Sequence, residues 1–238
     1  MLIQFTERLC DSPCVSRVWH AHSRHEGPFL SVAYPQWEVV VSRVNDSVSL
    51  TLRGPETFAS RAWVPAEGSW VGVRFKNGAM MPSLRYRLLV DAALSLPAAD
   101  NHSFWLDGEK WEIPSFENAE AFVARLVRAG LLVWDPFITG SLRGEGLRKD
   151  NARAVQRRFS KSTGLSRKAI LTIERAHSAA IMLRGGATIS DTVAALGYSD
   201  QPHLTRSLKR LIGLTPARLA SKQKPVQLSF MAKPEPLA

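Results

Sequence analysis

Cysteine and long apolar runs are scarce in this sequence. The two cysteines among 238 residues, Cys10 and Cys14, are too few for a disulfide framework. No apolar run reaches the roughly 18 residues that a transmembrane helix needs. The start of the chain, MLIQFTERLC, lacks the basic and apolar regions of a signal peptide. These absences predict a soluble, cytoplasmic protein, and its length is sufficient for a real core.

Catalytic motifs are lacking as well. The sequence contains no G-x-S-x-G elbow, no phosphate-cradling loop and no H-E-x-x-H motif. A cupin-like metal-dependent enzyme would need a set of His and Glu ligands on its strands. Beyond His20, His22 and His25 no such set appears, since His102 stands alone. We therefore expect no catalytic residues, no cofactor and no enzymatic activity, and keep the metal-dependent enzyme as an alternative.

The amino-terminal Cys and His residues leave three interpretations open. Cys10 and Cys14 have a spacing found in zinc sites, and a strand would place His20 and His22 on one face. A redox pair of the two cysteines is the second interpretation. No other closely spaced cysteine pair supports zinc, so we interpret these residues, with His25, as scattered polar side chains. No metal is expected.

Positive charge is concentrated in one part of the chain. The formal net charge is +10. Residues 143–224 hold 17 Lys and Arg against 5 Asp and Glu, whereas residues 1–142 hold 13 against 15. Such an excess in one contiguous segment favours a polyanionic partner, through an attraction that is strong but independent of sequence. Charge alone thus favours nucleic acid over a generic solubility surface.

The first half of the chain has the pattern of short strands. Apolar and polar positions alternate over 70–75, before an Asn-Gly turn, and β-rich runs at 37–41 and 48–52 flank a predicted turn at 45–47. Several short strands at this spacing predict a small antiparallel barrel or sandwich.

Two helices are predicted before residue 135. Residues 117–129 place Phe122 and Leu126 on one apolar face, and Gly130 follows where a helix would end. Residues 84–94 are the second helical segment. All tryptophans also lie in this half, where we prefer core packing to an apolar ligand pocket as the explanation. They are Trp19, Trp37, Trp63, Trp70, Trp105, Trp111 and Trp134.

A break in composition divides the chain. Asp135-Pro136 is followed closely by three glycines, and beyond this stretch the strand pattern gives way to helical periodicity. The sequence therefore predicts an α+β protein, with a small β-barrel or cupin-like amino-terminal domain that also has helices, and an all-α carboxy-terminal domain. The predicted parts are an amino-terminal domain at 1–134, a linker at 135–147, a helical domain at 148–224 and a flexible tail at 225–238.

The helical segment contains a weak internal repeat at an offset of 49 residues. The run VQRRF at 155–159, followed by Gly164, matches LTRSL at 204–208, followed by Gly213. Both glycines suit the left-handed residue that ends a helix. Each copy also shows an apolar stripe at helical spacing. The two stripes are Ala152, Val155 and Phe159, and Leu204, Leu208 and Leu211.

Capping residues mark further helix starts. Ser166 and Thr215 follow the two glycines as N-caps, and TISD at 188–191 resembles a capping box. GYS at 197–199 is a tight turn. A helix is expected between the capping box at 188–191 and the turn at 197–199. Its buried face is expected at Val193, Ala194 and Leu196. A helix, a glycine turn and a helix with basic and amide side chains facing outward is the helix-turn-helix layout.

These residues resemble a known family. The run ISDTVAALGYSDQPHLTR, residues 189–206, resembles the second helix-turn-helix of the AraC/XylS family of transcription regulators, and the signature continues to Pro216. Residues 153–166 are similar to the first motif of that family, and 166–183 fit its long connecting helix. The resemblance covers about a third of the chain. It is specific because two motifs occur at this spacing. Leu208 departs from the family pattern, which usually has Phe at this position.

The resemblance implies two recognition helices that enter successive major grooves, which lie roughly 34 Å apart. Arg153 and Arg157 match the base-facing positions of the first helix, and Gln201, His203 and Arg206 match those of the second. Arginine suits guanine and glutamine suits adenine. Other side chains are expected at phosphates, which position the protein without specifying sequence. They are Gln156, Arg158, Lys161, Thr205, Lys209 and Arg210.

The same resemblance implies a role for each domain. The domain at 148–224 would bind double-stranded DNA as part of an activator or a repressor, and the domain at 1–134 would sense a small-molecule effector or dimerise. RNA polymerase is a further expected partner and a membrane is not. The chain would act as a monomer or a homodimer. Besides the enzyme, the alternative is a protein-interaction module that offers its basic helical face to an acidic partner.

Overall fold

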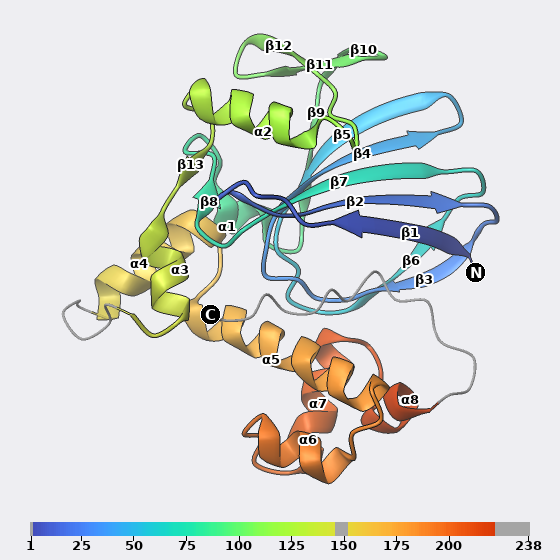
Figure 1. Ribbon diagram of the computed structural model, residues 1–238, viewed down its shortest axis with the longest axis vertical. Coiled ribbons are helices and arrows are strands. Elements are labelled where there is room, and N and C mark those ends of the chain that lie inside the picture. The colour runs from blue at the N-terminus through green and yellow to red at the C-terminus, as the bar shows by residue number, and fades with distance from the viewer. Residues whose placement is uncertain (1, 146–151, 222–238) are drawn as a thin grey trace.

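The computed structural model describes residues 2–145 and 152–221, and in Figure 1 a sheet-rich amino-terminal half lies above a helical carboxy-terminal part. The predicted α+β class is confirmed. None of the helices in these two ranges is long and apolar enough to cross a membrane. The tail predicted at 225–238 lies outside the described residues, as do residues 146–151, where the predicted linker meets the helical domain.

A six-stranded antiparallel sheet forms the centre of the amino-terminal half, in the order β1-β2-β7-β4-β5-β9. The strands are β1 (Ile3–Arg8), β2 (Val15–Ser23), β4 (Glu38–Val44), β5 (Ser47–Arg53), β7 (Ser69–Phe75) and β9 (Ala93–Leu96). Three of them confirm the strands predicted at 37–41, 48–52 and 70–75. The predicted turn is confirmed too, since Asn45 and Asp46, both with positive φ, connect β4 to β5.

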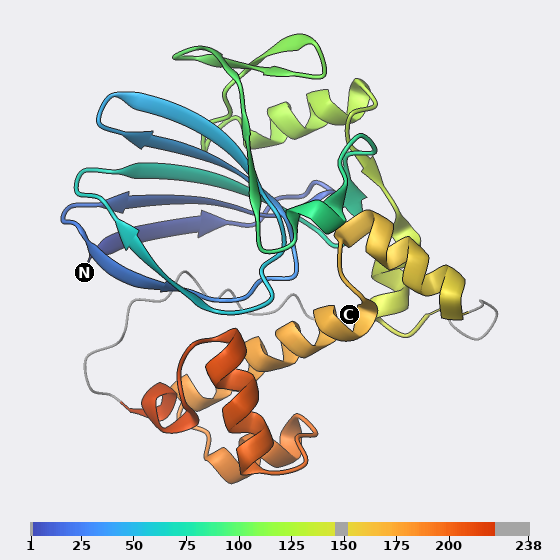
Figure 2. The ribbon, with the colours of Figure 1, turned by 180° about the vertical axis from the view of Figure 1, so that it is seen from behind.

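The sheet does not close into the predicted barrel. Strands β3 (Gly27–Ser31) and β6 (Ser60–Val64) pair with each other instead of joining it. Among the described strands no closed barrel forms, because β1 and β9 each have one neighbour in the sheet and remain edges. The cupin-like part of the prediction is not confirmed. In both views β3 and β6 lie below the large sheet, on the side of the carboxy-terminal helices (Figures 1 and 2).

Smaller elements complete the amino-terminal half. They are β8 (Ala79–Met80), α1 (Tyr86–Leu89), β10 (Ala98–Asp100), β11 (Ser103–Leu106), β12 (Glu109–Glu112), α2 (Ala119–Arg128) and β13 (Val133–Trp134). Helix α2 confirms the helix predicted at 117–129, with Phe122 and Leu126 buried and Gly130 at φ +71°. The helix predicted at 84–94 is wrong beyond α1, because Ala93 and Leu94 start β9, whose pairing with β5 overrides the local helical preference.

The carboxy-terminal part is helical. It contains α3 (Pro136–Leu142), α4 (Ala152–Thr163), α5 (Arg167–Arg184), α6 (Ile189–Ala195), α7 (Gln201–Leu211) and α8 (Pro216–Ala220). The apolar stripe predicted on α7 is confirmed, since Leu204, Leu208 and Leu211 are all buried. The stripe on α4 is shorter than predicted: Phe159 is buried and Val155 is half-buried, but Ala152 is exposed.

The stretch predicted as a linker at 135–147 contains helix α3. Asp135 caps this helix by accepting a hydrogen bond from the amide of Phe137 at 3.1 Å. Ile138 and Leu142, four residues apart on the helix, are buried with residues of α5 and α7 in one hydrophobic cluster. Proline and glycine mark a break in sequence pattern here, and the chain nevertheless packs through these two apolar side chains.

The hydrophobic core has two clusters, and the second one joins the two halves of the chain. The first lies inside the amino-terminal half, where the rings of Trp37 and Phe75 stack at 3.9 Å. The second combines Leu30 of β3, and Val32 and Ala33 just after it, with the buried faces of the carboxy-terminal helices. Burial of apolar surface therefore holds the helices against the segment that follows β3.

Candidate nucleic-acid interface

The second helix-turn-helix is formed by α6 and α7, and hydrogen bonds fix both helix starts. Thr188 Oγ1 accepts from the amide of Asp191 at 3.0 Å, which confirms the N-cap of the predicted capping box, and it donates to the Asp191 carboxylate at 2.6 Å. Gly197 has φ +65° in the turn. Asp200 then caps α7 by accepting from the amide of His203 at 2.6 Å. The direction in which α7 leaves the turn is thereby set by side-chain caps.

The buried face of α6 differs from the prediction. Thr192 is the fully buried residue, Val193 and Leu196 are half-buried, and Ala194 is exposed. The hydroxyl of Thr192 donates to the carbonyl oxygen of Thr188 at 2.8 Å, so this polar side chain is satisfied inside the helix. Hydrophobicity alone therefore misidentified the inward face of a helix of seven residues.

Helix α7 presents most of its predicted DNA-contacting side chains to solvent. Gln201, Arg206, Lys209 and Arg210 are exposed, opposite the buried leucines of the same helix. Thr205 is half-buried. The exposed side of α7 therefore combines an amide at its start with three cations further along.

His203, another of the base-facing candidates, makes contacts within the protein. Its Nδ1 lies 3.1 Å from the hydroxyl oxygen of Ser199, and its ring meets the Tyr198 ring edge-on at 5.1 Å. Because Nδ1 is engaged in the turn, Nε2 is the nitrogen that His203 has to offer to a base.

Helix α4 belongs to the first motif, and α3 precedes it along the chain and packs against it. Arg153, Gln156, Arg157 and Lys161 are exposed on α4, as a role at DNA requires. Gly164 ends the helix at φ +77°, as predicted. A Cβ at Gly164 would overlap the carbonyl of Tyr86, so α4 meets α1 with close backbone approach.

Arg158 is exposed too, but it makes specific contacts within the protein. Its Nε and Nη2 each donate to the Asp135 carboxylate at 2.7 Å, and its guanidinium lies 4.3 Å from the centre of the Phe137 ring. This bidentate ion pair fastens α4 to the start of α3. A phosphate at Arg158 would have to compete with that carboxylate.

Helix α5 separates the two motifs. With 18 residues it is about 27 Å long, with α4 preceding its start and α6 and α7 following its end, as Figure 1 shows. Ser166 caps α5 by accepting from the amide of Ala169 at 3.1 Å, which confirms the predicted N-cap. Halfway along α5, the Arg175 guanidinium lies 4.5 Å from the centre of the Tyr198 ring and donates to the Gly197 carbonyl oxygen at 3.4 Å. The connecting helix thus contacts the turn of the second motif directly.

The contacts of the helical part with the segments after β3 and before β6 were missed by sequence reasoning. The amide of Ala33 donates to the carbonyl of Leu211 at 2.8 Å, and the amide of Ala59 donates to that of Arg210 at 2.7 Å. His177 Nε2 donates to the carbonyl oxygen of Ala33 at 2.6 Å. Backbone groups carry no sequence signal, so only the polar His177, on an otherwise apolar helix face, could have indicated this docking.

Burial changes the acid-base behaviour of His177. Its side chain is 4% exposed, and removal from water, opposed by the hydrogen bond to Ala33 and assisted by the nearby Arg74 charge, lowers its pKa to about 4. At neutral pH the ring is therefore uncharged and donates one hydrogen bond.

The Cys and His residues near the amino terminus are not brought together as a set. Within residues 2–145 and 152–221, no group of three or more His, Cys, Asp or Glu side chains is placed to hold a metal ion. Both cysteines are free thiols, whose pKa burial raises. His20 Nε2 lies 3.3 Å from the Ser69 hydroxyl, His22 Nε2 lies 3.9 Å from a Glu67 carboxylate oxygen, and His25 is exposed.

The tryptophans support both explanations that the sequence left open, apart from Trp105, which is exposed and outside the pocket. Trp37 and Trp111 are buried in the first hydrophobic cluster, as core packing predicts. Trp19, Trp63 and Trp70 instead line a pocket of about 510 Å³.

Comparison with known proteins bears on the carboxy-terminal part. A family model for a helix-turn-helix domain matches residues 151–222. The domain is of the AraC type, which transcription regulators use to bind DNA. No curated protein and no solved structure matches the chain.

Proposed function

We propose that this protein is a sequence-specific transcription regulator whose helices α4 and α7 read successive major grooves of one DNA duplex. The observation that carries the proposal is the arrangement along α5: a rigid helix of about 27 Å with a candidate recognition helix at each end. Its length is of the same order as the roughly 34 Å that separates major grooves on one face of DNA. The match to a helix-turn-helix domain over 151–222 supports the same function.

The proposal assigns two kinds of contact. Arg153 and Arg157 on α4, with Gln201, His203 and Arg206 on α7, contact bases. Phosphate contacts position the duplex without reading it. They are Gln156, Lys161, Thr205, Lys209 and Arg210, with Arg158 joining them once it exchanges Asp135 for a phosphate.

The amino-terminal half is the regulatory part in this proposal, through an effector or through dimerisation. Its support is the shared hydrophobic cluster, because a change near Ala33 reaches α5 and α7 without crossing a flexible connection. RNA polymerase is the partner that an activating regulator would need.

The test is selection of bound sequences from a random duplex pool, with the full chain at one stated salt concentration. We expect enrichment of a motif with two blocks about one helical turn apart. Enrichment of one block would contradict the role of α4 and retain that of α7. Binding without enrichment, which fades as salt rises, would overturn sequence-specific recognition and favour a basic interaction module.

A further inference from the structure

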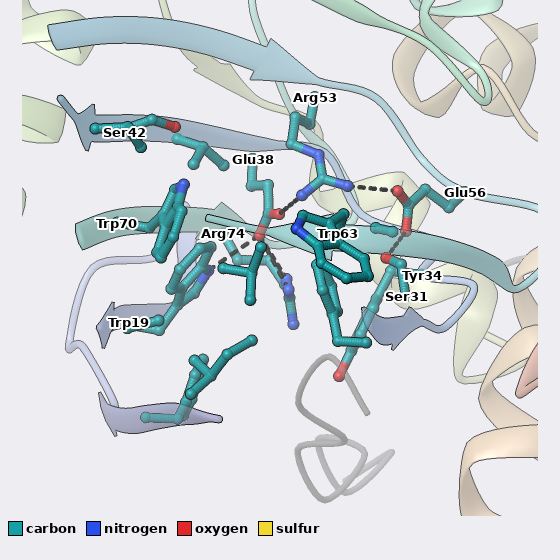
Figure 3. Close-up of a pocket in the computed structure, with 18 of the residues that line it drawn as sticks. Trp19, Ser31, Tyr34, Glu38, Ser42, Arg53, Glu56, Trp63, Trp70 and Arg74 are labelled. Carbon is teal, nitrogen blue, oxygen red and sulfur yellow. Dashed lines mark hydrogen bonds and ion pairs between the residues drawn. The ribbon is translucent and has the colours of Figure 1, made fainter. Parts of the chain in front are cut away.

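A pocket lies between the six-stranded sheet and the β3–β6 pair, on the side of the sheet that faces away from the first hydrophobic cluster. Its volume of about 510 Å³ is within the range of sites for small organic molecules. Figure 3 shows its aromatic walls, with Trp19 and Trp70 on one side and Trp63 and Tyr34 on the other. Phe5 stacks on Trp19 at 5.7 Å between ring centres and extends the first wall.

The position of Trp19 depends on a glycine in the sheet. Its indole lies against Gly72 on the neighbouring strand β7, and a Cβ at that position would overlap the ring. The indole Nε1 donates to the Glu38 carboxylate at 3.1 Å. The aromatic wall is therefore held in place by the backbone on one side and by a buried carboxylate on the other.

The charged side chains of the pocket are paired with one another. Glu38 Oε2 accepts from Arg74 Nη2 at 3.0 Å, and Glu56 Oε1 accepts from Arg53 Nη2 at 2.6 Å. Ser31 donates to the other oxygen of Glu56 at 3.1 Å. Burial opposes ionisation of Glu38, but Arg74 and Arg53 outweigh it and hold its pKa below the ordinary value. Two acids and two bases line the pocket, so the lining has no net formal charge.

From these features we infer that the pocket binds a neutral aromatic molecule. A flat ring system gains stacking area against Trp19, Trp70 and Trp63. A charged ligand would lose hydration without a counter-ion, because the carboxylates and guanidiniums already satisfy one another. Hydroxyl or carbonyl groups on the ring can still hydrogen-bond to the polar lining, which includes Ser42.

The pocket also has a direct physical connection to the DNA-binding domain. The Arg74 guanidinium lies 3.8 Å from the centre of the Tyr34 ring, and that ring meets His177 of α5 edge-on at 4.6 Å. Ser31 and Tyr34 line the pocket, while Ala33 between them bonds to His177 and to the end of α7. A ligand that shifts Tyr34 therefore shifts a residue packed on α5. This regulatory step deepens the proposed function and rests on it.

The ligand class is tested by equilibrium dialysis with three probes that share one ring system: 2-naphthol, 2-naphthoate and 2-naphthylmethylammonium, neutral, anionic and cationic at pH 7. We expect 2-naphthol to bind at least about ten-fold more tightly than either ion, a difference of about 1.4 kcal/mol. Equal affinity for all three, or tighter binding of an ion, would overturn the class, and so would no binding.

Two exposed tryptophans provide a matched pair for locating the probe. Trp63 lines the pocket on β6, whereas Trp105 on β11 does not, and both are exposed enough to be replaced without loss of core. We expect Trp63→Ala to weaken 2-naphthol binding about five-fold or more, and Trp105→Ala to leave it unchanged. Equal effects of the two substitutions would place the probe elsewhere and overturn the assignment.

The connection to α5 is tested by amide hydrogen exchange, a measurement that needs no DNA. With 2-naphthol bound, we expect altered exchange in α5 around residues 173–180. His177→Gln keeps a donor for Ala33 but removes the ring that meets Tyr34, so this variant should bind the probe and lose the altered exchange. Ser178→Ala is the control and should behave as the wild type, since the Ser178 hydroxyl donates to the Glu174 carbonyl oxygen within α5 itself.

Two outcomes of this experiment contradict the connection. One is unchanged exchange in α5 of the wild type with the probe bound, and the other is an unchanged response in His177→Gln. Because dialysis and exchange are measured without DNA, their failure is distinguishable from failure of the pool selection, which alone tests DNA recognition.

Discussion

Arg206 and Lys209 lie three residues apart on α7, both exposed, and the proposal gives them different tasks. Arg206 reads a base and Lys209 holds a phosphate. We expect Arg206→Ala to weaken binding to the selected duplex by about 1–3 kcal/mol while binding to random duplex changes little. Fluorescence anisotropy titrations on the two duplexes give both numbers.

Lys209→Ala is the matched control for that substitution. It should weaken binding to both duplexes alike and reduce the slope of log affinity against log salt by about one. If Arg206→Ala instead produced equal losses on both duplexes, its role at a base would be wrong.

The buried ion pair of Glu38 and Arg74 supports a second prediction at the scale of single residues. Both side chains are 10% exposed. Arg74→Met would leave a buried carboxylate with a neutral donor, Trp19 Nε1 at 3.1 Å, and with the longer ion-pair contact to Arg53 at 3.8 Å. We expect a loss of about 3–5 kcal/mol in the free energy of unfolding, measured by urea denaturation.

Arg53→Met is the control, since the Arg53 side chain is 37% exposed and partly exposed pairs contribute about 1 kcal/mol or less. Similar losses in the free energy of unfolding for Arg74→Met and Arg53→Met would show that burial of the ion pair does not determine its contribution to stability.

At the scale of elements, the docking of α5 depends on a neutral His177. The folded protein holds its pKa near 4, whereas an unfolded chain has the ordinary value of about 6.5. Between these values the unfolded state takes up a proton that the folded state excludes, so stability is complete above about pH 6.5 and falls as the pH drops toward 4. The loss from this residue is on the order of 3 kcal/mol.

The measurement is the free energy of unfolding between pH 4 and 7 for the wild type and for His177→Gln. The carboxylates titrate in both proteins, so the difference between the two curves isolates the histidine. Arg74 and Tyr34 are the charged or titratable side chains described near His177. Parallel curves would contradict a buried neutral imidazole.

Elements with strong local signals were predictable from sequence. Strands β4, β5 and β7 followed from alternation and turn residues, and the caps at Ser166, Thr188 and Thr215 followed from hydroxyls at helix starts. Elements decided by tertiary contacts were not. Ala93 and Leu94 are a strand because β5 offers an edge, and α3 forms in a predicted linker because Ile138 and Leu142 have a cluster to enter.

The exposure of most candidate DNA-binding side chains was also predictable, because the position of a residue on an amphipathic helix is a local property. The pocket was not. Trp19, Glu38 and Arg74 come from three different strands that only the register of the sheet brings together. The docking of α7 on Ala33 and Ala59 uses backbone groups, which no residue type reveals.

At the scale of the whole molecule, the carboxy-terminal helices and the amino-terminal sheet share one hydrophobic cluster. The two candidate recognition helices also have separate supports. Helix α4 is fastened through Asp135 and packs on α1, whereas α7 bonds to the segment after β3 and to the Ala59 amide. The separation between α4 and α7 therefore depends on the amino-terminal half as well as on α5.

The most direct test of the central claim assigns each block of the selected DNA motif to one helix. Pool selection is repeated with the double variants Arg153→Ala/Arg157→Ala on α4 and Gln201→Ala/Arg206→Ala on α7. The account predicts that each variant loses one block, a different one in each case, and keeps the other block. Loss of the same block in both variants, or of neither, would contradict reading of successive major grooves by α4 and α7.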